Sequence, residues 1–165
     1  NVHRKIEQMS KIQDGYLKVE TNFIKLLMEN KELRNSVISD IKSDEFSIDE
    51  TKEIFNYIIK NKELDKITID KIKSLNISEE YLNDLDNISL NSINTYDSKN
   101  VDEIIKNVKR NKFHKEVEAL LKKQKKLELS LNQNSLDKDR MKEVELEIMN
   151  ISLEIVDIQK SLKSL

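Results

Sequence analysis

Apolar residues near the carboxyl end of the chain recur in alternating steps of three and four. In segment 136–165, which we predict to be helical, they form an unbroken seam: Met141, Val144, Ile148, Ile151, Ile155, Ile158, Leu162 and Leu165. Segment 98–131 carries the same steps at Phe113, Val117, Leu120, Leu127 and Leu131, with Gln124 as a polar break. This heptad pattern is typical of two helices that pack along a shared seam.

A short polar stretch separates these two segments. Asn132, Gln133 and Asn134 interrupt the first helix, and Ser135 is predicted to cap the second through its side-chain oxygen. Helices joined by so short a turn must lie antiparallel. We therefore predict a helical hairpin over residues 98–165.

The second arm carries a further apolar row, again in steps of three and four: Leu146, Met149, Leu153 and Val156. A hairpin of two helices has no third helix to cover this row, and a contiguous apolar strip in water usually marks a binding surface. The alternative interpretation is that the row packs on the preceding part of the chain. The sequence pattern leaves both interpretations open.

The first part of the chain shows shorter helical patterns, separated by Ser, Asn, Asp and Thr residues that cap helices well. The predicted helices cover roughly residues 2–13, 16–29, 31–41, 68–75 and 78–88, and a further helix opens at Ser47 and presents Ile54, Phe55, Ile58 and Ile59. Ser47 and Glu50 are predicted to form a capping box, and Phe46 before them to be a buried anchor. Residues 91–96 look like a joint. We predict a helical bundle over 1–97, with 1–15 as linker or first helix, followed by the hairpin over 98–165.

Composition narrows the fold class to all-α. The chain has 165 residues with one Gly and no Pro, and it lacks the turn glycines and alternating runs of a β-sandwich or barrel. The absence of Cys excludes disulfides and thiolate metal sites, and fits a reducing, cytoplasmic setting. No apolar run is long enough for a membrane span. Because the chain starts at Asn1 without a signal-peptide pattern, we expect an excised fragment.

Candidate chemistry is sparse. His3 and His114 stand far apart, without neighbours spaced as metal ligands, and no P-loop, dinucleotide fingerprint or nucleophile elbow occurs. Acidic residues lie at helix starts and on outward faces, where the helix dipole and solvation explain them. We expect no catalytic residues, no metal and no cofactor.

A basic stretch from Lys106 to Lys126 is interleaved with Glu and lacks aromatics for base stacking, and the net charge is −2. We therefore expect no strong direct binding of nucleic acid.

Several stretches together resemble the carboxy-terminal domain of bacterial DNA primases (the DnaG type). They run from Glu20 through Phe23 and Leu27 to Leu33, then Asp44-Glu45-Phe46 with Glu50 to Phe55, then Asn100 to Lys109, and onward through the hairpin. The resemblance covers nearly the whole chain and rests on the order and spacing of these stretches. It implies a helical bundle followed by a hairpin that docks on the amino-terminal domains of the hexameric replicative helicase (DnaB type). In that role the domain recruits primase to the replication fork and modulates helicase activity, without catalysis of its own.

On this sequence the expected partner-binding residues lie on the second arm: Leu146, Met149, Leu153 and Val156 as apolar contacts, with Gln159 and Lys163 at the rim. Three alternatives stay open. The amino-terminal domain of the helicase itself is similar to the primase bundle, although it is expected to carry glycine-containing turns. A coiled-coil scaffold would use the same heptads to form homodimers. A nucleic-acid-binding helical module would use Lys122 to Lys126.

Overall fold

In the computed structural model, the structure describes residue 15 and residues 18–88, 98–133 and 136–165. All regular structure in these residues is helical, which confirms the predicted all-α fold. The chain divides into two compact units, residues 1–109 and 110–165, so helix α6 (Ser98–Leu131) contributes to both. The helix predicted over 2–13, the joint predicted over 91–96 and the cap predicted at Ser135 lie outside the described residues.

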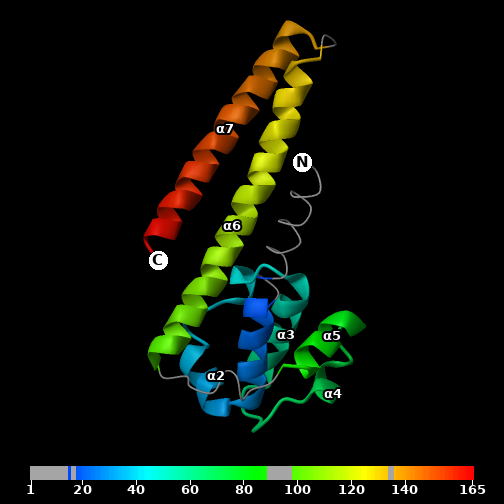
Figure 1. The fold of residues 1–165 in the computed structure, drawn as a ribbon, viewed down its shortest axis with the longest axis vertical. Helices are drawn as coiled ribbons and strands as arrows, with labels where there is room; N and C mark the ends of the chain where they lie inside the picture. Colours follow the sequence, from blue (N-terminus) through cyan, green and yellow to red (C-terminus); the bar gives the residue numbers. More distant parts are fainter. Residues whose placement is uncertain (1–14, 16–17, 89–97, 134–135) are drawn as a thin grey trace. The chain divides into compact units, whose positions relative to one another are not determined.

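The first unit is built from short helices around one apolar core. Its elements are a helical stretch over residues 18–29, then α2 (Lys31–Val37), the 3-10 helix η1 (Ser43–Glu45), α3 (Asp49–Lys60), α4 (Ile69–Ile72), α5 (Glu79–Asp86) and the first turns of α6 (Figure 1). Phe23, Phe46 and Phe55 pack at its centre, with ring centroids 6.1 Å apart for the first pair and 4.9 Å for the second. Phe46 is fully buried, which confirms the predicted anchor. Val101, Ile105 and Val108 of α6 complete the core.

The capping box predicted at Ser47 and Glu50 is wrong. Helix α3 begins after Ile48 and has no side-chain cap; just before it, the backbone N–H groups of Ser47 and Ile48 donate to the carboxylate of Glu20, a buried residue distant in sequence. Glu50 instead accepts from the N–H and hydroxyl of Ser78, both at 2.8 Å. Both residues of the predicted box thus make tertiary contacts instead, and the carboxylate of Glu20 lies where the dipole of α3 favours negative charge.

The carboxylate of Glu20 also ends a buried polar chain. The Tyr81 hydroxyl lies 2.9 Å from Thr51 Oγ1, and the Thr51 side chain bonds Glu20. Burial raises the pKa of Glu20 although these hydrogen bonds oppose the rise, and burial raises the pKa of Tyr81 to about 12. This series of hydrogen bonds joins the stretch 18–29 to α3 and α5. Its hydrogen bonds satisfy polar groups that would otherwise be costly to bury.

The side chain of Arg34, in α2, bonds backbone carbonyls at the carboxyl end of the stretch 18–29. The guanidinium of this fully buried side chain donates to the carbonyls of Leu27 (2.9 Å) and Met28 (3.0 Å), which no longer have partners within their own helix. Its other nitrogens reach the carbonyls of Lys62 (3.3 Å) and Asp65 (3.5 Å), in the loop after α3. One cation therefore fixes three segments of the first unit.

The second unit is a helical hairpin. It consists of the part of α6 from Arg110 onward and of α7 (Lys138–Lys163), which lie side by side and antiparallel (Figure 1). Gln124, the polar break in the first seam, donates to the carbonyl of Ile148 (3.1 Å) and to Ser152 Oγ (2.7 Å). A polar side chain within a seam fixes its register, because a shift along the helix would leave the amide unpaired.

Helix α7 starts two residues later than the predicted segment 136–165. The helix begins at Lys138, and its N-cap is Asp137, whose Oδ1 accepts from the N–H of Arg140 at 2.7 Å. An Asp at this position has an advantage over Ser, because its charge also interacts favourably with the helix dipole. The helix predicted over 78–88 is present as α5, and Ser78 is its N-cap, since its Oγ accepts from the N–H of Tyr81.

Candidate interaction surface

Helix α7 has two apolar faces. One is the internal seam, in which Val144 is 1% and Ile151 is 5% exposed. The other is the row predicted from the sequence, where Leu146 is 53%, Met149 55%, Leu153 59% and Val156 45% exposed. These four account for most of the large hydrophobic side chains exposed in the described part of the chain. We call Leu146, Met149, Leu153 and Val156 the outer row.

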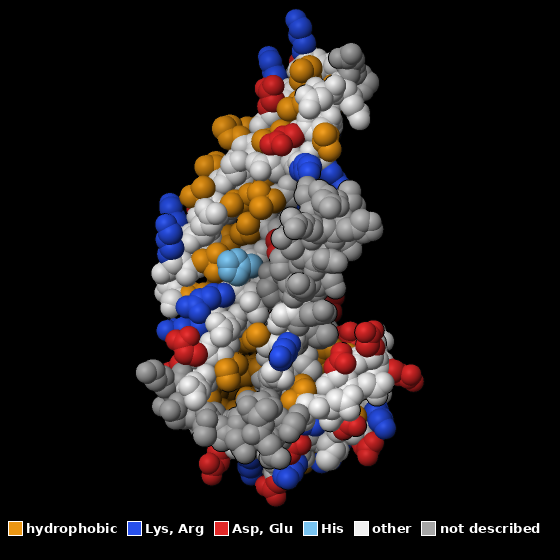
Figure 2. Space-filling view, viewed as in Figure 1, with side chains coloured by type: hydrophobic (Ala, Val, Ile, Leu, Met, Phe, Trp, Pro, Cys, Tyr) orange, Lys and Arg blue, Asp and Glu red, His pale blue; other side chains and the backbone are white. Residues whose placement is uncertain are grey.

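The geometry of the helix accounts for this exposure. Each residue of an α-helix turns roughly 100° about its axis, so two positions two residues apart point roughly 200° apart. Leu146 and Leu153 follow the buried Val144 and Ile151 at that interval and therefore point away from the internal seam. Hydrophobic side chains are visible along the hairpin in Figure 2. A stripe with this period matches the seam of another helix.

The predicted rim residues Gln159 and Lys163 are both exposed. Their positions differ, because Lys163 continues the steps of the outer row, whereas Gln159 lies beside it. Sequence reasoning missed two members of the same series. Lys142 and Lys160 extend the outer row at its two ends in steps of four, so the apolar stretch is bounded by cations.

The charges beside the outer row are of one sign. Between Lys142 and Lys160, every charged residue of α7 is acidic: Glu143, Glu145, Glu147, Glu154 and Asp157. Glu143 pairs with Arg140, with 2.9 Å between Oε2 and Nη1. The other four carboxylates are exposed and make no ion pair within the described segments. The outer row is thus an apolar stripe with acidic borders.

The outward face of α6 in the hairpin is different in character. Leu121 and Leu129 are 49% and 57% exposed, but they are eight residues apart and form no stripe. The lysines from Lys122 to Lys126 around them are exposed. This surface combines isolated leucines with solvated cations, and it lacks the periodicity that makes the outer row a candidate for helix packing.

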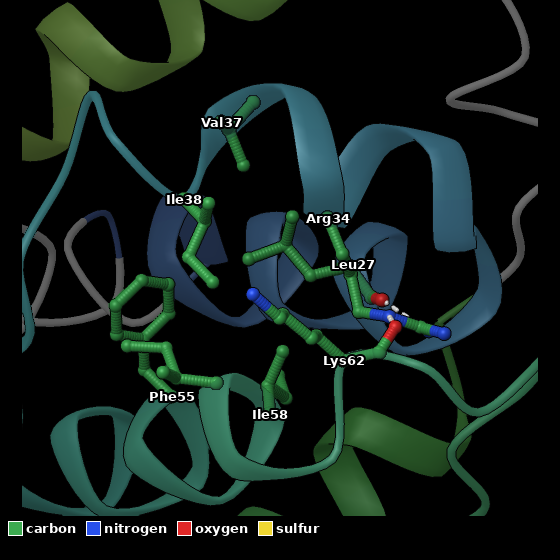
Figure 3. A pocket seen from close by; sticks show the side chains of 8 residues that line it. Leu27, Arg34, Val37, Ile38, Phe55, Ile58 and Lys62 are labelled. Atoms are coloured by element: carbon green, nitrogen blue, oxygen red, sulfur yellow. Dashed lines mark hydrogen bonds between the residues drawn. The ribbon is translucent and has the colours of Figure 1, made fainter.

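A shallow pocket occurs in the first unit, between α2 and α3 (Figure 3). Its empty space of about 210 Å³ includes open solvent, so little of it is enclosed. Its walls are mainly apolar, with contributions from Leu27, Phe55 and Ile58. Arg34, its buried polar side chain, is already bonded to backbone carbonyls (Figure 3).

The titratable groups with shifted pKa values belong to the scaffold. Glu20, Arg34 and Tyr81 lie within the first unit, and burial is the largest cause of each shift. Among the residues that the structure describes, no three His, Cys, Asp or Glu side chains cluster in a way that could hold a metal ion. His114 is exposed, and His3 lies outside the described residues. No helix in the described ranges is both long and apolar enough to span a membrane.

The comparisons with known proteins found no similar protein. No protein-family model matches the chain, and neither a curated protein nor a solved structure is significantly similar to it. The class of protein is therefore defined by its own fold: an all-helical chain with a two-helix hairpin whose second helix is apolar on two faces.

Proposed function

We propose that the chain is a non-catalytic interaction domain of the bacterial DNA primase type, which binds the amino-terminal domains of the hexameric replicative helicase. In this role it recruits primase to the replication fork and modulates the helicase. The observation that carries the proposal is the outer row of α7, four large apolar side chains in helical register, each about half exposed. Apolar side chains aligned in this way favour burial against a partner.

Two further features support an interaction role. The outer row lies on α7, which is held in a fixed register by the internal seam and by Gln124, so its side chains are preorganised on a rigid element. The order of the sequence stretches that resemble the primase domain supplies the choice of partner. Together they favour docking through the hairpin over the open alternatives.

The test uses the whole chain, mixed with the replicative helicase of the same organism, in size-exclusion chromatography with light scattering. The unchanged chain is expected to co-elute with the hexamer. The double variant Leu146→Gln/Leu153→Gln is expected to bind at least about tenfold more weakly, because truncating interface hot spots costs more than about 1 kcal/mol each. Gln has a helix propensity close to that of Leu, so α7 should be preserved.

The hairpin offers a matched control. Leu121→Gln/Leu129→Gln alters two leucines on α6 with exposed fractions close to those of Leu146 and Leu153, and it removes the same amount of apolar surface. This control should bind as the unchanged chain does. If both double variants bind equally well, the outer row is not the docking surface. If the unchanged chain does not bind the helicase at low salt, the partner is wrong.

Point variants are preferable to removal of the hairpin. Val101, Ile105 and Val108 of α6 lie in the core of the first unit. A truncation before α6 would therefore remove core residues as well as the hairpin, and loss of binding would then have two explanations.

A further inference from the structure

The structure of α7 constrains what the partner presents to it. We propose that the outer row receives a single amphipathic helix of the partner, whose apolar seam is bordered by Lys or Arg. This inference rests on the proposed function, because it takes the outer row to be the docking surface. It specifies the chemistry of the docked element, which the choice of helicase leaves open.

The shape of the outer row calls for a helix. Its members occupy the a and d positions of a second heptad register on α7, and Lys142, Lys160 and Lys163 extend that register at both ends. From Leu146 to Val156 the stripe runs for about 15 Å at 1.5 Å per residue. A straight stripe of this period packs best against the seam of another helix, as in helix-in-groove recognition.

The borders of the outer row set the charge of that helix. In this register Glu145 occupies a g position and Asp157 an e position, the positions that contact the flanks of a partner helix. Both carboxylates are exposed and have no ion pair in the described part of the chain. The e and g positions from Glu143 to Gln159 hold no cation. Basic flanks on the partner are therefore favoured, and acidic flanks are repelled.

The same charges disfavour a second copy of this chain as the occupant. If two α7 helices packed antiparallel along their outer rows, Lys142 would face Lys160 of the other copy, and Glu143 would approach its Asp157. In a parallel pair, Lys142 and Lys160 would each face their own counterparts. Both arrangements place like charges at the ends of the seam, where a partner with acidic residues at its two ends would instead be matched.

The test uses two synthetic helical peptides with the same Leu and Ile seam, one with Lys and the other with Glu at every e and g position. Each peptide is kept from pairing with itself by its own charges. The full chain is titrated with each peptide by fluorescence anisotropy at low salt. We expect the Lys-flanked peptide to bind on the order of tenfold more tightly, because both border carboxylates then attract instead of repel.

Charge reversal supplies the decisive comparison. Glu145→Lys/Asp157→Lys should abolish the preference for the Lys-flanked peptide. Asp84→Lys/Asp86→Lys changes the net charge equally at two exposed carboxylates of α5, in the first unit, and should keep it. Equal affinity for the two peptides, or a preference that survives Glu145→Lys/Asp157→Lys, overturns the inference even if the helicase binds. A retained preference without helicase binding overturns the choice of helicase and leaves the charge selectivity standing.

Self-association is measured on the unchanged chain by sedimentation equilibrium. A monomer, or an oligomer unaffected by Leu153→Gln, agrees with a foreign helix as the occupant. A dimer that Leu153→Gln dissociates would overturn the inference, because the outer row would then be occupied by a second copy.

Discussion

Arg34 is a buried cation whose hydrogen-bond partners are backbone carbonyls. Burial lowers the pKa of Arg34, while Asp65 and Glu63 act in the opposite direction. Its contribution lies mainly in satisfying the carbonyl of Leu27, and it shares the carbonyl of Met28 with the backbone N–H of Ile67. The planar guanidinium suits this task because it directs several N–H groups toward separate acceptors.

Replacing this side chain with an apolar one of similar length tests its role. Arg34→Met should lower the free energy of unfolding by about 2–4 kcal/mol, since it removes the hydrogen bonds of the guanidinium and leaves the buried carbonyl of Leu27 without a donor. Arg34→Lys should also be destabilising, because an ammonium cannot reach all of the carbonyls at once. Urea denaturation followed by circular dichroism measures both changes. A loss below about 0.5 kcal/mol for Arg34→Met would mean that water replaces the guanidinium at little cost.

The buried phenol of Tyr81 makes the free energy of unfolding depend on pH in the alkaline range. Its pKa rises from 10.0 to about 12 in the folded chain, chiefly through burial. A folded pKa above the unfolded one gives a stabilisation that is complete below about pH 10 and is lost as pH rises through about 12. The rise of about two units in the pKa of Tyr81 corresponds to about 2–3 kcal/mol in the free energy of unfolding.

The variant Tyr81→Phe removes this titration together with the hydrogen bond to Thr51. Below pH 10 the variant should be less stable than the unchanged chain, by about 1 kcal/mol. Between pH 10 and 12 the difference should shrink and then reverse, because only the unchanged chain loses stability through this phenol. Urea denaturation at a series of pH values measures the difference, in which the titration of the many lysines cancels. A difference that stays constant from pH 8 to 12 would exclude this role.

At the scale of the element, α7 has two apolar faces with different tasks. Ile151 is almost completely buried in the internal seam, whereas Leu153, two residues on, is mostly exposed. Ile151→Ala should lower the free energy of unfolding by about 2–4 kcal/mol, because it leaves a cavity in the hairpin. Leu153→Ala should change it by less than about 1 kcal/mol.

Binding measurements should give the opposite order for Leu153. If the outer row docks a partner, Leu153→Ala weakens binding to the helicase while the hairpin stays folded. Thermal denaturation of the two variants, together with their co-elution with the helicase, separates the two faces. Equal destabilisation by the two substitutions would mean that Leu153 is buried in the folded chain.

The elements that the sequence predicted best are those specified by local pattern. The heptads led directly to the hairpin, and the start of the helix predicted over 78–88 was located correctly because its N-cap, Ser78, bonds an N–H only three residues away. The contact between Glu20 and the backbone before α3 was not predicted because Glu20 is far from Ser47 in sequence. The role of Arg34 escaped for the same reason, although a lone cation on the apolar face of a helix was a signal that could have been followed.

The candidate surface was predictable in part. Its four apolar members follow from the steps of three and four, and the same steps, continued outward, lead to Lys142 and Lys160. The exposure of the outer row could not be derived from the sequence, because the pattern of a helix with two apolar faces is the same whether the second face is covered or bare. That difference depends on tertiary packing and required the structure.

At the scale of the whole molecule, α6 belongs to two compact units. Its residues up to Lys109 contribute to the core of the first unit, and those from Arg110 onward to the hairpin. Each unit has buried side chains of its own, with Phe46 in the first and Ile151 in the second. Local stability in proteins follows such cooperative groups of contacts. We therefore expect amide hydrogen exchange along this single helix to change near residue 110.

Two core substitutions test this division. Ile151→Ala should speed exchange about thirtyfold in α7 and in the part of α6 after residue 110, in line with a loss of about 2 kcal/mol. Phe46→Leu should speed exchange in α3 and in the first turns of α6. Mass spectrometry of peptic peptides on either side of residue 110 gives the measurement. If either substitution speeds exchange uniformly over both units, they unfold together, and α6 couples them as a single cooperative element.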